Sequence, residues 1–152
     1  MKLAEALSQR KDLQIRISQL EERLKNNVKV QDGDEPFEDP KELFKELDRS
    51  LVKLEELIFK INKTNMLTTT ASGKTLTQLM AERDVLGMRV RVLRSVFDHV
   101  SSTHDRYSRT EIKYNTTIDV KALHKQVDQY AQKFRELDME LQAINFSVDL
   151  MD

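Results

Sequence analysis

Apolar residues recur at alternating spacings of three and four along most of this chain, which is the periodicity of amphipathic helices. The pattern is widest in residues 76–100, where Arg83 is the one polar residue on the main stripe. That stripe has nearly the coiled-coil period and predicts a helix packed against a partner. A second stripe beside it widens the apolar arc, so we expect this helix to contact more than one neighbour. The main stripe contains Leu76, Leu79, Leu86, Val90, Leu93, Phe97 and Val100, and the second contains Ala81, Val85, Met88, Val92 and Val96.

Three other stretches carry the same periodicity, so the sequence predicts four helices. The first, 2–30, has the narrow stripe of a helix at a bundle edge or in a two-stranded coiled coil. The second is 40–66, and the last, 120–148, has the most regular stripe, unbroken over four heptads. These stripes contain Leu3, Ala6, Leu13, Ile17, Leu20 and Leu24; then Leu43, Leu47, Leu51, Leu54, Ile58 and Ile61; and finally Val120, Leu123, Val127, Tyr130, Phe134, Leu137, Leu141, Ile144 and Val148.

Capping residues mark where three of these helices begin. Asp39 is a good N-cap, and Pro40 suits the first helical position because its missing N–H would have no partner there. Thr75 and Gln78 form a T-x-x-Q capping signature before the third helix. Asp119 stands at the same place before the last helix.

An acidic linker, 31–39, separates the first two helices. Its carboxylates suggest calcium binding, but a calcium loop needs ligands at alternating positions, a glycine at position six and a glutamate at position twelve. The linker lacks that arrangement, so we favour a solvated segment. The carboxylates belong to Asp32, Asp34, Glu35, Glu38 and Asp39.

The segment 101–119 loses the helical period and reads as an extended crossover. Tyr114 and Thr116 share a parity with neighbouring isoleucines, and these residue types favour extended structure. We therefore expect a short strand at about 111–116. A single strand needs an edge to pair with, either in a small hairpin or in another subunit.

Together these elements predict a single all-α domain, 1–152, folded as a four-helix antiparallel bundle with long coiled-coil-like helices. The short connection between the second and third helices predicts that they form an antiparallel hairpin. In that hairpin Ile58 faces Val85–Leu86, and Asn62 lies beside Ala81–Glu82. Gly87 lies mid-helix, where we interpret it either as a place of close backbone approach or as a tolerated residue.

The composition of the 152 residues narrows the class of protein. Two prolines, three glycines and 34% charged residues fit long helices and argue against a sheet protein or a disordered chain. The absence of cysteine rules out disulfides, thiolate catalysis and zinc–thiolate sites. A net charge of −1 without a basic stripe argues against nucleic-acid binding.

The sequence favours a cytoplasmic protein. Residues 1–12 carry charge from residue 2 onward and have no apolar core of a signal peptide. No stretch approaches the roughly 20 apolar residues needed to span a bilayer.

We predict no catalytic, metal or cofactor site. The three histidines are His99, His104 and His124, and the Glu-x-x-His spacing of di-iron bundles is absent. No serine lies in the sequence context of a nucleophile elbow. We therefore expect a protein that is not an enzyme.

Polar residues near one end of the predicted second and third helices form the first candidate site. Arg83 lies on an apolar stripe, and a buried arginine needs a partner. We favour a hydrogen-bonded network that fixes the register, as a core asparagine does in coiled coils. The alternative is a polar ligand pocket. The candidate residues are Asn62, Thr64, Asn65, Glu82 and Arg83.

A second candidate lies in the crossover. Two arginines and a lysine around Tyr and Ser could hold a phosphate or carboxylate. Because no glycine-rich anion-binding turn accompanies them, we favour a loop held by salt bridges or an oligomer contact. The residues are Arg106, Tyr107, Ser108, Arg109, Glu111 and Lys113.

Five segments distributed over the whole chain resemble the septicolysin family of small bacterial proteins. They are KLAEAL, LIFKINKTN, TLTQLMAERDVL, RYSRTEIKYNTTIDV and FRELDMELQAIN, of which RYSRTEIK is the most distinctive. The resemblance implies a soluble, mainly helical fold, and the family name implies a cytolysin. It supplies no catalytic residues.

The leading functional hypothesis is a cytoplasmic helical interaction or scaffold protein that forms a homo-oligomer and also meets an unidentified protein partner. One alternative is a membrane-active, cytolysin-like protein, although its polar faces mix both charges instead of being rich in Lys and Arg. Another is a small anionic-ligand-binding protein that uses Arg83 or the segment 106–113.

Overall fold

The computed structural model describes residues 1–102 and 114–152. These residues form four α-helices and no strand, so the predicted all-α class and the four helices are confirmed. Their bounds differ from the predicted ones by three residues at most. The helices are α1 (Leu3–Asn27), α2 (Pro40–Leu67), α3 (Leu76–Ser101) and α4 (Val120–Ser147).

The predicted capping residues begin their helices as expected. The Asp39 carboxylate accepts a hydrogen bond from the backbone N–H of Lys41 at 3.0 Å. Thr75 and Gln78 form a reciprocal capping box, with bonds of 2.8 and 3.3 Å. Asp119 accepts from the N–H of Ala122 at 3.1 Å. Each cap satisfies a backbone donor that the first helical turn leaves without a partner.

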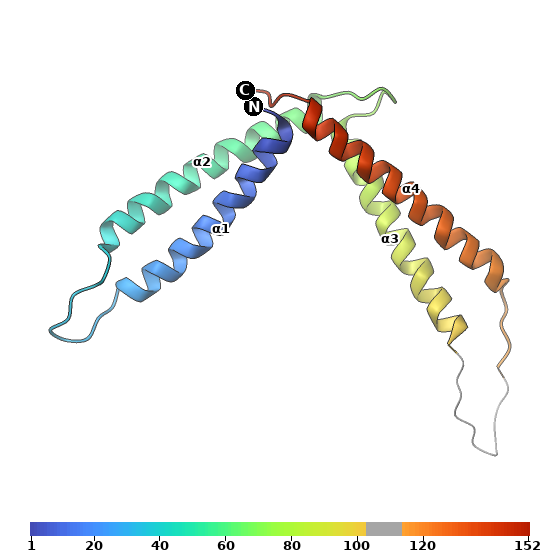
Figure 1. The fold of residues 1–152 in the computed structure, drawn as a ribbon, viewed down its shortest axis with the longest axis horizontal. Helices are drawn as coiled ribbons and strands as arrows, with labels where there is room; N and C mark the ends of the chain where they lie inside the picture. Colours follow the sequence, from blue (N-terminus) through green and yellow to red (C-terminus); the bar gives the residue numbers. More distant parts are fainter. Residues whose placement is uncertain (103–113) are drawn as a thin grey trace, which may run out of the picture.

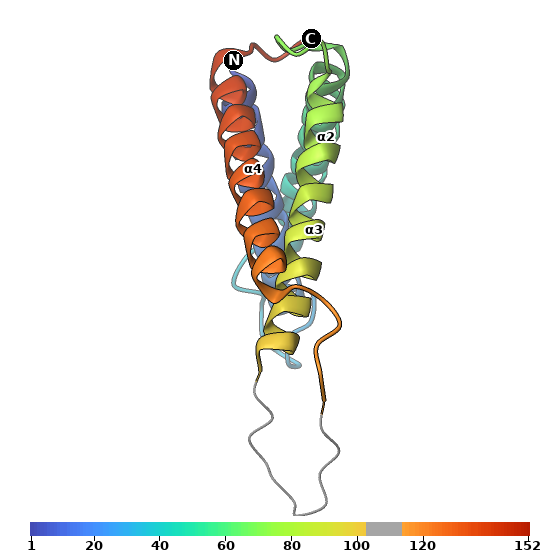
Figure 2. The ribbon, with the colours of Figure 1, turned by 90° about the vertical axis from the view of Figure 1, so that its right-hand side faces the viewer.

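The four helices form two antiparallel pairs that diverge like an inverted V (Figure 1). One arm consists of α1 and α2, and the other of α3 and α4. Both chain ends lie at the apex (Figure 1). Viewed from the side, α2 and α3 lie on one face of the V, and α1 and α4 lie on the opposite face (Figure 2).

The predicted pairing of α2 with α3 along their lengths was wrong. These helices meet at the apex and then separate, so Ile58 and Val85 are 36% and 59% exposed instead of facing each other. The reason is that the main stripe of each helix already packs on a sequence neighbour. Leu57 and Ile61 lie in the core with α1, while Val90 on α3 is buried against α4.

All four helices contribute to one apolar core at the apex. Leu3, Ile61 and Leu76 are each at most 1% exposed, and burying a leucine or isoleucine side chain contributes about 1.5–3 kcal/mol. The core fixes where the two arms join. Its buried members are Leu3, Ala6, Leu57, Ile61, Leu76, Leu79 and Leu141, with Leu7, Leu13, Leu137, Ile144 and Leu150 packed against them.

The two arms repeat one another about an approximate two-fold axis through the apex. Four backbone hydrogen bonds there form two equivalent pairs, which link the start of one helix to the residues after another. They are Leu3 N to Val148 O (2.9 Å) and Leu150 N to Met1 O (2.8 Å), and, in the same geometry, Leu76 N to Thr68 O (3.1 Å) and Thr70 N to Lys74 O (2.9 Å). The isolated bridges Lys2–Asp149 and Thr69–Thr75 repeat in the same way.

The amino-acid sequence repeats along with the backbone. When Leu3 is placed on Leu76, and Asp39 on Asp119, identical residues fall at equivalent positions of the two hairpins. We conclude that the fold is an internal duplication of one helical hairpin. The other identical pairs are Arg10/Arg83, Leu13/Leu86, Arg16/Arg89, Leu20/Leu93, Lys41/Lys121, Leu43/Leu123, Lys45/Lys125, Asp48/Asp128, Lys53/Lys133, Glu56/Glu136, Leu57/Leu137 and Asn65/Asn145.

Gly87 makes room for an aromatic ring and not for a neighbouring backbone. A Cβ atom on Gly87 would lie 3.1 Å from Cε2 of Phe134 on α4. In the other hairpin the equivalent positions hold Gln14, which is larger than glycine, and Leu54, which is smaller than phenylalanine. The small residue and the bulky aromatic ring therefore occur together in one hairpin and are both absent from the equivalent positions of the other.

This exchange predicts that Gly87 and Phe134 are coupled. Gly87→Ala removes a mid-helix glycine, which gains up to about 1 kcal/mol, but in the wild-type background the Phe134 ring opposes the new methyl group. We expect the gain to appear fully only when Phe134→Leu is also present. Urea unfolding of the four proteins of a double-mutant cycle measures the coupling. Equal effects of Gly87→Ala in both backgrounds would contradict this account of Gly87.

Candidate interaction face

Arg83 bridges α3 and α4 and is half-buried. Its Nη1 donates to Oδ1 of Asp138 at 3.2 Å, and its Nε donates to Oδ1 of Asp84 at 3.0 Å. Burial lowers the pKa of Arg83, but hydrogen bonds to the two carboxylates outweigh this and raise its pKa overall. The sequence identified Arg83 but not Asp138, because the second helix and not the last was predicted to pair with the helix that carries Arg83.

The five residues of the first candidate site do not converge. Glu82 is exposed and pairs with Lys74 at 2.6 Å. The Thr64 hydroxyl is fully buried, donates to the Lys60 carbonyl at 2.8 Å and accepts from the Met151 N–H at 2.9 Å. The other two members, Asn62 and Asn65, are exposed and buried respectively. These separate contacts bring no single ligand pocket together.

The second candidate set lies in 103–113, outside the described residues, as does the first part of the predicted strand. The last part of that strand is described: residues 114–116 carry no strand, and Tyr114 is 84% exposed.

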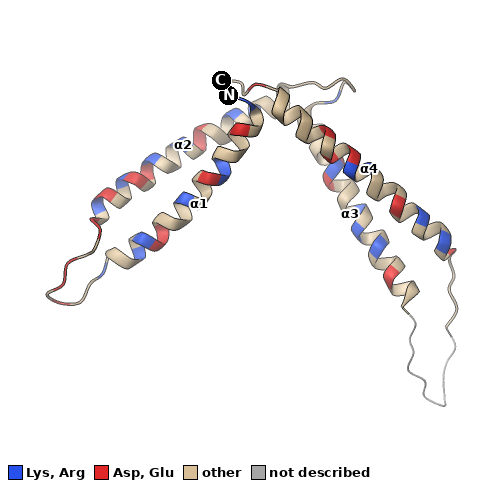
Figure 3. Cartoon of the chain, viewed as in Figure 1, with Lys and Arg blue, Asp and Glu red and all other residues tan. Residues whose placement is uncertain are grey.

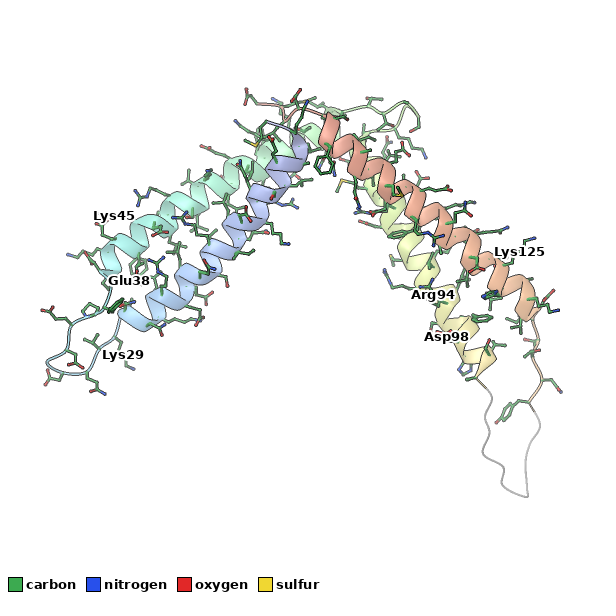
Figure 4. The ribbon with its side chains drawn as sticks, viewed as in Figure 1. Lys29, Glu38, Lys45, Arg94, Asp98 and Lys125 are labelled. Carbon is green, nitrogen blue, oxygen red and sulfur yellow. The ribbon has the colours of Figure 1, made fainter. Side chains whose placement is uncertain are left out.

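The acidic linker is fastened to the helices at one end. The Asn27 side chain accepts from the Glu38 N–H at 2.8 Å, and Arg23 Nε donates to the Glu38 carboxylate at 3.0 Å. The hydrogen bond from Arg23 lowers the pKa of Glu38. Acidic residues gather along the linker at the open end of this arm (Figure 3), and Figure 4 shows Glu38 and Lys29 at this same end. Nowhere in 1–102 or 114–152 do three or more His, Asp or Glu side chains gather to hold a metal ion.

The second stripe of α3 is exposed to solvent. Ala81 at its start is exposed, and its four larger side chains, Val85, Met88, Val92 and Val96, are 59%, 55%, 61% and 42% exposed. At 3.6 residues per turn they lie roughly 120° around the helix from the residues that face α4. The sequence predicted that this stripe would contact a second neighbour, and the described residues place none over it.

A matching apolar stripe runs along α2. Phe44, Leu51 and Ile58 recur every seven residues, which places them on one line beside the residues that face α1. Val52 and Phe59, 58% and 66% exposed, extend the stripe around the helix. α2 and α3 lie on the same side of the V (Figure 2). Helical spacing directs both stripes away from the residues that pack on α1 and α4, so we assign the two stripes to one face of the molecule. We call these nine residues of α2 and α3 the α2/α3 face.

The α2/α3 face exposes a large apolar area that is divided between the two arms. From the exposed fractions of its nine side chains, we place the total at about 900 Å², of which each helix contributes roughly half, against roughly 300–600 Å² for the largest single patch on a typical monomer. Each stripe is therefore as large as the largest patch of a typical monomer, and such patches are often functional.

The duplication provides an internal control for this face. The α1 positions equivalent to Val85, Met88, Val92 and Val96 are Asp12, Ile15, Gln19 and Arg23. Those equivalent to Phe44, Leu51, Val52, Ile58 and Phe59 on α4 are His124, Ala131, Gln132, Asp138 and Met139. The same backbone therefore folds with mostly polar residues at these positions, so the hairpin itself does not require the apolar stripes of α2 and α3.

The comparisons with known proteins extend this description of an all-α protein built from two helical hairpins. The chain belongs to a family of unknown function, DUF6847, whose model matches residues 10–150. It is similar to the crystal structure of a functionally unknown conserved protein from Corynebacterium diphtheriae, at 38% identity over 99% of both chains, with a TM-score of 0.91. No curated protein matches. Neither description mentions septicolysin, so that resemblance stays a prediction.

No helix in the described part of the chain combines the length and the apolar character that a membrane span requires.

The Arg83–Asp138 pair is testable against its equivalent in the duplicated half. Arg10 stands at the same place on α1 but pairs with no carboxylate among the described residues. We expect Arg83→Ala to destabilise the protein by about 1 kcal/mol more than Arg10→Ala, because it removes the cationic partner of the half-buried Asp138 and leaves that carboxylate with only the neutral Gln142 amide as a donor.

Urea unfolding measures both changes, and Arg83→Leu reports whether apolar packing compensates for the lost pair. Equal losses for the two alanine variants would mean that the ion pair contributes nothing beyond the packing of the arginine stem.

Proposed function

We propose that this chain is a non-enzymatic, cytoplasmic helical interaction protein that assembles with copies of itself through the α2/α3 face. The observation that carries the proposal is the difference between the two halves of the duplication. Equivalent positions are apolar and exposed on α2 and α3 but mostly polar on α1 and α4. Exposing apolar side chains costs solubility and contributes nothing to folding, so a partner that covers them explains their presence.

The anionic-ligand alternative receives less support from the contacts of Arg83. A site for a phosphate or carboxylate needs a cation that the protein leaves available. Arg83 lies instead between the carboxylates of Asp84 and Asp138, which neutralise its charge.

The mass of the protein in solution tests this proposal. We expect light scattering to give a discrete multimer for the wild type. Val85→Glu combined with Val92→Glu should shift it to the monomer mass, because two charges per subunit would then be desolvated in the contact. Both side chains are more than half exposed, so the substitutions should leave folding unchanged by circular dichroism.

The matched control is Gln19→Glu, which adds a charge at the position of α1 equivalent to Val92 and should leave the mass unchanged. A monomeric wild type would contradict self-assembly. A monomer that also moves to anionic liposomes would favour the membrane-active alternative.

A further inference from the structure

We propose that two copies of this chain pair in one particular arrangement, in which α2 of each subunit packs antiparallel on α3 of the other. The inference rests on the proposed self-assembly and specifies its geometry. A two-fold axis that runs parallel to the bisector of the V, outside the α2/α3 face, relates the two copies. Each arm of one copy then lies against the opposite arm of its partner, and each pair of arms forms a four-helix bundle.

The direction of the helices suits this pairing. α2 runs toward the apex and α3 runs away from it (Figure 1). When the two V shapes lie back to back with their apices level, α2 of one copy is antiparallel to α3 of the other. Antiparallel neighbours are the usual arrangement in four-helix bundles.

The register follows from the apex. Thr68 and Leu76 are hydrogen-bonded there, so equal numbers of residues along α2 and α3 lead to the same distance from the apex. Ile58 is then level with Val85 of the other copy, and Leu51 is level with Val92, each within one residue. The exposed stripes of the two helices therefore coincide along the contact.

The same register brings opposite charges together. Glu55 of α2 and Arg89 of α3 are equally far from the apex, at thirteen residues from Thr68 and Leu76 respectively. Within the described residues Glu55 forms no salt bridge, and Arg89 has a neutral partner, the Tyr130 hydroxyl, at 2.8 Å. Across the proposed contact each would meet a group of the opposite charge, which fixes the register and disfavours other pairings.

The size of the face suits a second copy. Each subunit contributes about 900 Å² of exposed apolar side chain, and a stable interface of standard size buries about 800 Å² per partner. Closing the two arms of one chain would not cover this face, because α2 and α3 lie on a side of the V (Figure 2) and not between its arms.

Mixed single-cysteine variants test the arrangement. The chain has no cysteine of its own, so Leu51→Cys and Val92→Cys each introduce one thiol. The two positions lie on different arms, and under the proposed symmetry neither meets its own equivalent in the partner. We expect each variant alone to stay largely without covalent dimer on mild oxidation, whereas an equimolar mixture should give a covalent dimer as a major product on a non-reducing gel.

The control is a mixture of Gln19→Cys and Gln132→Cys, which should not become linked. On the α1/α4 side Gln19 is equivalent to Val92, and Gln132 is equivalent to Val52, the residue next to Leu51. Covalent dimer from the control mixture, with none from the mixture of Leu51→Cys and Val92→Cys, would overturn the arrangement and place the contact on the opposite face. Absence of covalent dimer from both mixtures would also overturn it. The mass of the wild-type protein distinguishes failure of this arrangement from failure of self-assembly. A multimer without the expected link contradicts only the arrangement, and a monomer contradicts self-assembly as well.

Discussion

The packing of all four helices at the apex is the constraint on which the rest of the structure depends. Leu3 and Leu76 begin the first helix of each hairpin, and Ile61 and Leu141 lie near the ends of the second helices, so the core joins both halves of the duplication. Away from the apex each arm has only two helices, and a pair of helices leaves much of each apolar arc exposed to water. Apolar side chains are therefore buried at the apex and partly exposed along the arms.

The duplication explains why the two hairpins share one backbone geometry, and it makes visible the positions at which their side chains differ. Equivalent backbone hydrogen bonds at the apex require the same geometry from both hairpins. Side chains away from the seams are free of that requirement, and there the halves differ: Val92 corresponds to Gln19, and Ile58 to Asp138. Differences between equivalent positions separate the residues that the hairpin needs for folding from those that it leaves exposed on its surface.

The periodicity of the sequence predicted the helices and their caps well, because both depend on local spacing and local hydrogen bonds. It failed on partner choice. α3 carries two apolar stripes, and their spacing alone does not determine which of them packs on α4. The ion pair between Arg83 and Asp138 was missed for the same reason, since it joins helices whose adjacency is set by the apex. The exposed stripe with Val92 was predicted to meet a second neighbour, and its exposure in the structure shows that no described helix of this chain covers it.

The central claim is that the wild-type protein covers the α2/α3 face by self-association. Amide hydrogen exchange of the unmodified protein, followed by mass spectrometry at low and high concentration, tests this most directly. Peptides from α2 and α3 should become more protected as the concentration rises, while those from α1 and α4 change less, because covering a helix face suppresses local opening. Protection that is independent of concentration while light scattering shows the mass changing, or that grows on α1 and α4 instead, would contradict the claim.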